Sequence, residues 1–186
     1  PSLLVTEVRI AGVNLADKAK VRSAARIVLG RNIILVDKSE VISGIRRLPE
    51  VRQVRVGRTF PNRVWVRVWE RRPDAIVVAG GRCCMIQLDG FAFHQTAGPV
   101  RGVPAIRVSR CGPLVEGRQC VGQDVVHALS VLACARKERL PVAEISVDPL
   151  GDMCLNMEGG FYVKLGQPDE IARKMSILRN TLACRP

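Results

Sequence analysis

Residues 48–73, LPEVRQVRVGRTFPNRVWVRVWERRP, contain two runs of alternating residues on either side of a short break at Phe60-Pro61-Asn62. Alternation of period two is typical of a half-buried β-strand, because successive side chains point to opposite faces of a sheet. Pro presets φ and Asn tolerates a left-handed backbone, so the break predicts a turn and the whole stretch predicts a β-hairpin. One face of this hairpin is apolar and can be covered by helices: Val54, Val56, Val64, Val66 and Val68.

A strand and two amphipathic helices are predicted before the hairpin. Residues 5–10 alternate, apolar residues follow at helical spacing from Asp17 and again from Asp37, and Pro49 ends the second helix. We therefore expect residues 1–73 to form a small domain in the order βααββ, which is a compact size for an independent unit.

The second face of this small sheet carries a basic and aromatic set: Arg55, Trp65, Arg67 and Trp69. Two helices can cover only one face of a three-stranded sheet, so this set is expected to remain available to a partner. Trp and Arg are enriched at binding hot spots. The alternative is that the Trp rings pack against a second domain or are shielded by the Arg stems.

Residues 74–186 predict a second domain made of a mixed or antiparallel sheet flanked by two helices, so that the fold class is α+β. Between the strands, Gly and Pro mark loops at residues 98–104 and 112–117. The expected elements are strands at 75–79, 83–88, 91–94 and 145–147, a helix capped by Asp124, a hairpin turning at Gly159-Gly160, and a last helix that begins at Pro168.

Charge is distributed unevenly along the chain, whose formal net charge is +12. Residues 1–73 carry 16 Lys and Arg against 6 Asp and Glu, whereas residues 74–186 carry 13 against 11. This asymmetry indicates two units, the first of which lies beside an anionic partner, either phospholipid headgroups or nucleic acid. A well-solvated basic surface is the alternative. No run approaches the roughly 20 apolar residues of a membrane-spanning helix, and we interpret a chain that opens with Pro1 as a fragment.

The seven cysteines are an odd number, so they cannot all pair within one chain. Cys83 and Cys84 are adjacent in a strand-like run, where neighbouring side chains point to opposite faces, so a metal shared between them is not expected. Cys111 and Cys120 bracket a loop that contains Gly and Pro, and they can close a small disulfide in an oxidising compartment. Free buried thiols are the alternative.

The sequence holds no constellation typical of an enzyme. It lacks the motifs G-x-S-x-G, H-E-x-x-H and G-x-G-x-x-G, a Walker loop and any C-x-x-C pair. His94 and His127 are isolated, and the carboxylates are scattered along the chain. We therefore expect no catalytic residue, no cofactor, no metal and no small-molecule substrate, and we interpret the chain as a binding or scaffold protein.

Several segments, taken in order, resemble one family of proteins. They are Val8–Asn14 before two helices, Leu48-Pro49-x-Val51, Arg58-Thr59-Phe60-Pro61, Glu70-Arg71-Arg72-Pro73, Leu88-Asp89-Gly90-x-x-Phe93, Val103–Ile106 and Gly160–Gly166. The first resembles the opening of a POTRA domain, and the ordered set is similar to the bacterial cell-division family FtsQ/DivIB. The resemblance implies a POTRA domain at residues 1–73 and a β domain at 74–186 that ends without the family's terminal strand.

This resemblance also implies a function and a location. Members of the family are non-enzymatic scaffolds that link early and late septation components by binding coiled-coil membrane proteins of the FtsB and FtsL type. They are single-pass, type II proteins of the bacterial inner membrane, with these two domains on the extracytoplasmic side. The basic first domain would then lie near the anionic membrane surface, where each basic residue adds about 1 kcal/mol of attraction.

Our candidate docking surface is a strand near the end of the chain together with two cations on the following helix: Phe161, Tyr162, Val163, Lys164, Leu165, Arg173 and Lys174. Strand addition suits such an edge, because backbone pairing provides affinity and alternate side chains provide register. Two alternatives remain: a nucleic-acid-binding protein in which Trp65 and Trp69 stack on bases, and a POTRA module for polypeptide transport. The resemblance favours a divisome partner and no nucleic acid.

Overall fold

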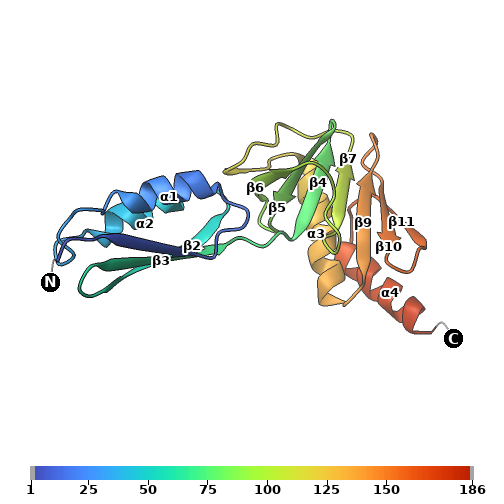
Figure 1. The fold of residues 1–186 in the computed structure, drawn as a ribbon. Helices are drawn as coiled ribbons and strands as arrows, with labels where there is room; N and C mark the ends of the chain where they lie inside the picture. The colour runs from blue at the N-terminus through green and yellow to red at the C-terminus, as the bar shows by residue number, and fades with distance from the viewer. Residues whose placement is uncertain (1–2, 185–186) are drawn as a thin grey trace. The chain divides into compact units, whose positions relative to one another are not determined.

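The computed structural model describes residues 3–184, and the chain divides into two compact units, Pro1–Arg71 and Arg72–Pro186 (Figure 1). We call them unit 1 and unit 2. Each unit has its own hydrophobic core, and each consists of a β-sheet packed against two α-helices, which confirms the predicted α+β class.

Unit 1 is a three-stranded sheet covered on one face by two helices (Figure 1). β3 is the central strand, because it pairs antiparallel with β2 and parallel with β1, from Glu7 opposite Arg63 to Ala11 opposite Arg67. The elements are β1 (Glu7–Ala11), α1 (Lys18–Arg26), α2 (Lys38–Arg46), β2 (Val51–Thr59) and β3 (Arg63–Glu70). The predicted hairpin is therefore the pair β2–β3, which turns at a cis Phe60-Pro61 bond.

The helices of unit 1 begin at aspartates and bury one apolar stripe each. The carboxylate of Asp17 accepts hydrogen bonds from the N–H groups of Ala19 and Lys20, and that of Asp37 accepts one from Ser39. Such caps satisfy donors that the first helical turn leaves without partners. The core joins the two stripes to the valine face of the hairpin; its helical and hairpin members are Val21, Ala25, Val41, Ile45, Val51, Val54, Val56, Val64, Val66 and Val68.

The last residues of unit 1 fasten two of its loops. Glu70 Oε1 accepts hydrogen bonds from the backbone N–H groups of Asn14, Leu15 and Ala16 at 2.9, 2.8 and 2.8 Å. These three groups belong to the loop between β1 and α1. Arg71 Nε donates to Pro49 O at 3.0 Å, in the loop between α2 and β2. The consecutive Glu70 and Arg71 thus hold both loops in place.

Gly12, in the same β1–α1 loop, sits directly against the central strand. Its φ is +86°, a conformation that L-residues rarely adopt. A Cβ atom at this position would lie 2.0 Å from Val68 O, which is a backbone atom. Only glycine fits here.

Unit 2 is a mixed eight-stranded sheet in the order β11-β10-β9-β7-β4-β5-β6-β8. β7 pairs in parallel with both β4 and β9, and the other neighbouring pairs are antiparallel. The strands are β4 (Ala75–Ala79), β5 (Arg82–Ile86), β6 (Phe91–Thr96), β7 (Ala105–Val108), β8 (Arg118–Gln119), β9 (Val142–Val147), β10 (Met153–Met157) and β11 (Tyr162–Gly166). The helices are α3 (Gln123–Lys137) and α4 (Ile171–Ala183), and Figure 1 shows both on the same side of the sheet.

Three local predictions for unit 2 differ from the structure. No strand is predicted at residues 105–108, between the two Gly- and Pro-rich loops, but these four residues form the interior strand β7; such a short strand shows no clear alternation. α3 is capped by Gly122, and Asp124 lies inside the first turn, where the helix dipole favours a carboxylate. α4 begins at Ile171 rather than Pro168, because Glu170 adopts a left-handed φ of +43°.

Candidate functional site

β11 is an edge strand of unit 2, hydrogen-bonded to β10 on one side only. The N–H of Met157 in β10 donates to Phe161 O at 3.0 Å. Ladder bonds alternate along an antiparallel pair, so the backbone groups of Tyr162 and Lys164 point away from β10, towards the open edge. An edge with outward-facing N–H and C=O groups is a template for the addition of another strand.

The side chains of β11 alternate between the core and the helix-free face of the sheet. Leu165 is buried against the helices, and Phe161 and Val163 are half-buried beside it. Tyr162 is 71% exposed and Lys164 is also exposed. Of the five residues predicted to form the docking strand, these two are therefore the ones that a partner can reach directly.

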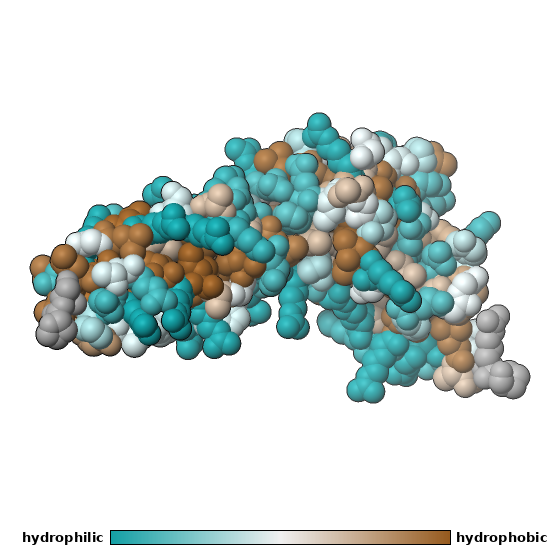
Figure 2. All heavy atoms as spheres, viewed as in Figure 1, coloured by the Kyte–Doolittle hydropathy of each residue, from teal (hydrophilic) through white to brown (hydrophobic). Residues whose placement is uncertain are grey.

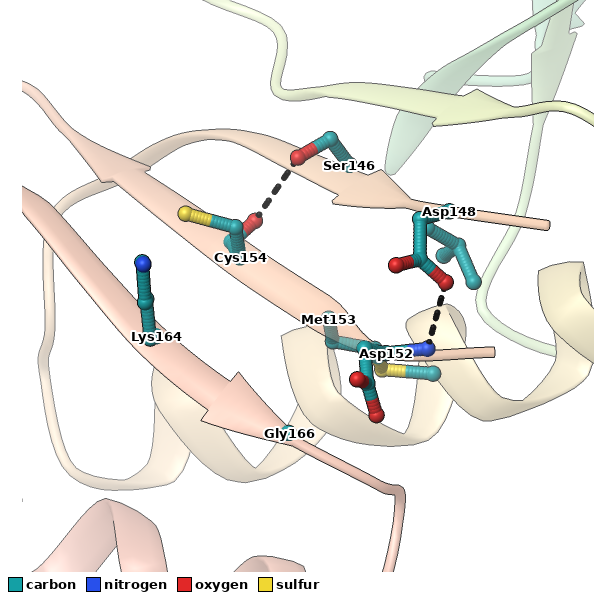
Figure 3. A pocket seen from close by; sticks show the side chains of 8 residues that line it. Ser146, Asp148, Asp152, Met153, Cys154, Lys164 and Gly166 are labelled. Atoms are coloured by element: carbon teal, nitrogen blue, oxygen red, sulfur yellow. Dashed lines mark hydrogen bonds between the residues drawn. The ribbon is translucent and has the colours of Figure 1, made fainter. Parts of the chain in front are cut away.

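Lys164 borders a shallow hollow on the helix-free face. It lies opposite Cys154 of β10, which in turn lies opposite Ser146 of β9. Figure 3 shows these three side chains on neighbouring strands, with Asp148 and Asp152 at the other end of the hollow. The hollow therefore continues the surface of the β11 edge across two further strands.

The two cations predicted on α4 have different surroundings. Lys174 is only 28% exposed at its side chain, and its Nζ donates to Gln167 O at 2.8 Å and to the Asp169 carboxylate. The hydrogen bond from Lys174 lowers the pKa of Asp169 from its ordinary value. Arg173 is more exposed and pairs with Glu170 at 3.0 Å. Lys174 thus fastens the turn before α4, and Arg173 is the cation on the outer surface.

The Arg/Trp set of unit 1 lies on the face opposite the helices, and its members contact one another. The guanidinium carbons of Arg55 and Arg67 lie 5.6 and 5.3 Å from the centroid of the Trp69 ring, which is cation–π geometry. Trp65 covers Gly57 on the neighbouring strand, since a Cβ at Gly57 would lie 2.1 Å from the indole ring. Both rings therefore pack on their own sheet, which does not favour base stacking on Trp69.

Unit 1 also exposes apolar side chains that the sequence did not predict as a site. Backbone bonds bring the contributing segments together: Ile33 N donates to Leu3 O at 2.8 Å, and Thr6 N donates to Asn62 O at 2.9 Å. Figure 2 shows hydrophobic residues at this end of the unit, where the chain starts. We call this set the apolar tip, and it consists of Leu3, Leu4, Leu29, Ile34, Leu35 and Phe60.

The tip was missed because part of it lies in the continuous apolar run Ile33–Val36. Such a run is typical of a buried segment. Ile33 and Val36 are indeed buried, but Ile34 and Leu35 between them are exposed, Leu35 by 80%. One signal in the sequence pointed to the exposure of Ile34 and Leu35: both fall outside the apolar stripes of the two predicted helices.

The remaining predicted pair, Cys111 and Cys120, is brought together, with 3.9 Å between the two sulfur atoms. Elsewhere, no three His, Cys, Asp or Glu side chains gather in a metal-binding arrangement within residues 3–184. Across the same residues, no helix has the length and apolar character needed to cross a membrane.

Comparison with known proteins adds a family to this geometry. Residues 3–71 match the family described as POTRA domain, FtsQ-type. These residues lie within unit 1, which has the βααββ order described above.

Three relatives extend the similarity beyond unit 1. The chain is 35% identical over 107 residues to cell division protein FtsQ of Streptomyces bingchenggensis, covering 57% of this chain and 40% of the relative. It is 28% identical over 186 residues to FtsQ of Anaeromyxobacter sp. (strain K), covering 97% and 63%. It is 20% identical over 201 residues to cell division protein DivIB of Clostridium botulinum (strain Loch Maree), covering 98% and 73%.

The chain thus spans 40% and 63% of the length of the two FtsQ relatives. The names of these relatives describe cell-division proteins and no enzymatic activity. Unit 1 thus contains an FtsQ-type POTRA domain, and nearly all residues of the chain are similar to cell-division proteins named FtsQ and DivIB.

Proposed function

We propose that the protein is a non-enzymatic divisome scaffold that binds membrane-anchored partners of the FtsB and FtsL type outside the cytoplasm and so links early and late septation components. The FtsQ-type POTRA domain of unit 1 and the similarity of the chain to cell-division proteins named FtsQ and DivIB support this role. The observation that carries the docking part is the open edge of β11, with Tyr162 and Lys164 exposed on it.

In this proposal a partner strand extends the sheet of unit 2 beyond β11. The outward backbone groups of Tyr162 and Lys164 pair with the added strand, and their side chains contact the partner on the helix-free face. Arg173, on the outer surface of α4, offers a cation to acidic partner residues, whereas Lys174 keeps the turn before α4 in place.

Lys164→Pro is expected to weaken partner binding at least about tenfold, because proline removes an outward N–H without touching the bonds to β10. The matched control Lys164→Ala keeps that N–H and removes only the side chain, so its loss should be smaller. Binding of the full-length protein to the extracytoplasmic segment of its FtsB-type partner is measured by titration calorimetry. Circular dichroism checks that both variants are folded.

Two outcomes of the titration are decisive. A clearly larger loss for Lys164→Pro than for Lys164→Ala supports strand addition at β11. Equal affinity of the two variants for the partner contradicts strand addition. If both variants also bind as tightly as the parent protein, the partner docks at another surface.

We further propose that the full protein is a single-pass, type II protein of the bacterial inner membrane, with both units on the extracytoplasmic side and the apolar tip of unit 1 seated in the anionic bilayer surface. Exposed Leu, Ile and Phe side chains on loops suit shallow insertion between headgroups. Basic residues around the tip outnumber acidic ones: Arg26, Arg31, Lys38, Arg58 and Arg63 against Glu7, Asp37 and Glu40.

Leu35→Ser is expected to weaken binding of the chain to vesicles about fivefold, because partial burial of one Leu contributes about 1 kcal/mol. The measurement is cosedimentation with vesicles of phosphatidylglycerol and phosphatidylcholine, compared with pure phosphatidylcholine. Leu150→Ser is the matched control, since Leu150 in unit 2 is also 80% exposed.

A selective loss for Leu35→Ser, together with stronger binding at higher phosphatidylglycerol content, supports the bilayer as the occupant of the tip. Equal behaviour of the two serine variants contradicts it. Loss of vesicle binding would leave the docking test at β11 unaffected, so the two parts of the proposal are tested separately.

A further inference from the structure

Cys111 and Cys120 lie at the two ends of one loop segment of unit 2. Cys111 lies between β7 and β8, and Cys120 lies between β8 and α3. Their Sγ atoms are 3.9 Å apart, which is contact distance for two unbonded sulfur atoms. Cys111 is half-buried and Cys120 is 7% exposed, so a reagent in solution meets Cys111 first.

The Cys120 side of the pair is firmly held. Its backbone N–H donates to Gly90 O at 2.9 Å, and the neighbouring Gly117 N–H donates to Ala92 O at 2.8 Å. Cys120 is part of the core of unit 2 together with Leu114, from the same loop. The sulfur of Cys120 therefore has a defined position.

The Cys111 side has room to adjust. Cys111 and Gly112 border two hollows, one on the side of Ala79 and Arg82 and the other on the side of Gln123. A Cβ placed on Gly112 would meet no atom within 4 Å. A disulfide needs the sulfur atoms at about 2.05 Å, so the Cys111 sulfur must approach by about 2 Å. The open surroundings permit that shift.

The two thiols also differ in their ionisation. A hydrogen bond between them, with Cys111 donating, lowers the pKa of Cys120 to about 6 despite its burial. The backbone N–H of Gly122, at the start of α3, acts in the same direction. The same hydrogen bond, together with burial and the neighbouring charge of Cys120, raises the pKa of Cys111. A nucleophilic thiolate on Cys120 thus faces the sulfur of Cys111.

We propose that Cys111 and Cys120 are a redox-active dithiol that forms a disulfide by exchange with a disulfide-containing oxidant and fastens the β7–β8 loop to the start of α3. The more exposed Cys111 passes the proton of their shared hydrogen bond to Cys120 as its sulfur attacks one sulfur of the oxidant, which forms a mixed disulfide and releases the first thiolate of the reagent. Cys120 then loses this proton and, as the thiolate, attacks the Cys111 sulfur and expels the second. The protein loses two electrons and two protons, and the oxidant becomes two thiols.

The bond has a structural consequence for one edge of the sheet. β8 pairs with β6 through only two residue pairs, Phe91 with Gln119 and Ala92 with Arg118. A covalent link between Cys111 and Cys120 closes the segment that contains β8 and restricts it in the unfolded chain. We expect the Tm of oxidised unit 2 to rise by about 5 °C over the reduced form.

The test uses oxidised glutathione as the oxidant and Cys184→Ser as the parent, because exposed Cys184 can link two chains. After oxidation the parent is expected to lose two free thiols and two hydrogens, with a peptide link between Cys111 and Cys120 in mass spectra. In the Cys120→Ser variant, the mixed disulfide on Cys111 should accumulate, since nothing resolves it. Cys134→Ser, a half-buried cysteine of α3, is the matched control and should behave as the parent.

Three results would overturn the proposal: an unchanged thiol count, a link that maps to another pair such as one with Cys83, or the same mixed disulfide in the parent and in Cys120→Ser. Cys111→Ala, at a half-buried loop position, keeps the assay meaningful if Cys120→Ser misfolds. That variant should form no intramolecular bond and should show no rise in Tm on oxidation.

Discussion

Gly12→Ala is expected to unfold unit 1. A left-handed φ costs an L-residue about 1–2 kcal/mol, and the new Cβ would lie 2.0 Å from Val68 O. Val68 belongs to the central strand, so its carbonyl cannot move without loss of sheet pairing. We expect a loss of about 4 kcal/mol or more, which is most of the stability of a domain of this size. Urea unfolding followed by Trp fluorescence reports on unit 1 alone, because both tryptophans, Trp65 and Trp69, lie there.

Gly30→Ala separates the two contributions. Gly30 also has a positive φ, +75°, but a Cβ there meets no atom within 4 Å. This variant should lose only the backbone term of about 1 kcal/mol and remain folded. If the two glycine variants are equally stable, close packing against Val68 is not what requires glycine at position 12.

Glu70→Ala has the second-largest expected effect. The substitution leaves the N–H groups of Asn14, Leu15 and Ala16 without their shared carboxylate, and the loop before α1 loses its anchor. Hydrogen bonds to charged groups contribute about 1.5–3 kcal/mol each when buried, and this site is partly exposed, so we expect a loss of about 3 kcal/mol in total. The same urea titration measures it.

Glu70→Gln is the conservative comparison, because the amide oxygen can still accept from the loop without the charge. We expect Glu70→Gln to lose about half as much free energy of unfolding as Glu70→Ala. A Glu70→Ala protein as stable as the parent would show that water satisfies the three N–H groups equally well.

The architecture of unit 1 could be predicted from its sequence because local signals and burial agree there. The alternating valines of the hairpin are all buried, and Asp17 and Asp37, from which the two helical patterns were predicted to start, cap the helices. The resemblance of Glu70-Arg71 to a family motif did not reveal its physical role. That role depends on contacts with residues 14–16 and with Pro49, which are far away in sequence.

Unit 2 was predicted less completely, for a reason of topology. β7 is four residues long, follows a Gly- and Pro-rich loop, and becomes a strand only because β4 and β9 pair with it on both sides. Helix α4 starts later than expected because Glu170 adopts a left-handed backbone, next to a turn in which Lys174 contacts Gln167 and Asp169. Both features arise from tertiary contacts, which local sequence patterns do not encode.

The candidate surfaces, too, combine features that local sequence patterns predict with features that depend on tertiary contacts. The hairpin that contains β11 was predicted from alternation on both sides of Gly159-Gly160, whereas its edge position required the strand order and the exposure of Tyr162 and Lys164 required the register with β10. The apolar tip brings together residues 3–4, 29–35 and 60, and no local pattern connects these segments. Their proximity depends on backbone bonds between the segments, such as that from Ile33 to Leu3.

The parallel pairing of β1 with β3 determines how unit 1 would carry mechanical load. The chain enters the unit at the start of β1 and leaves it at the end of β3, and these points lie at opposite ends of the same ladder. Tension applied between them acts along the strand axes, so the ladder from Glu7–Arg63 to Ala11–Arg67 is loaded in shear and its hydrogen bonds share the force. Under such tension, the hydrogen bonds between β1 and β3 would resist together rather than break one after another.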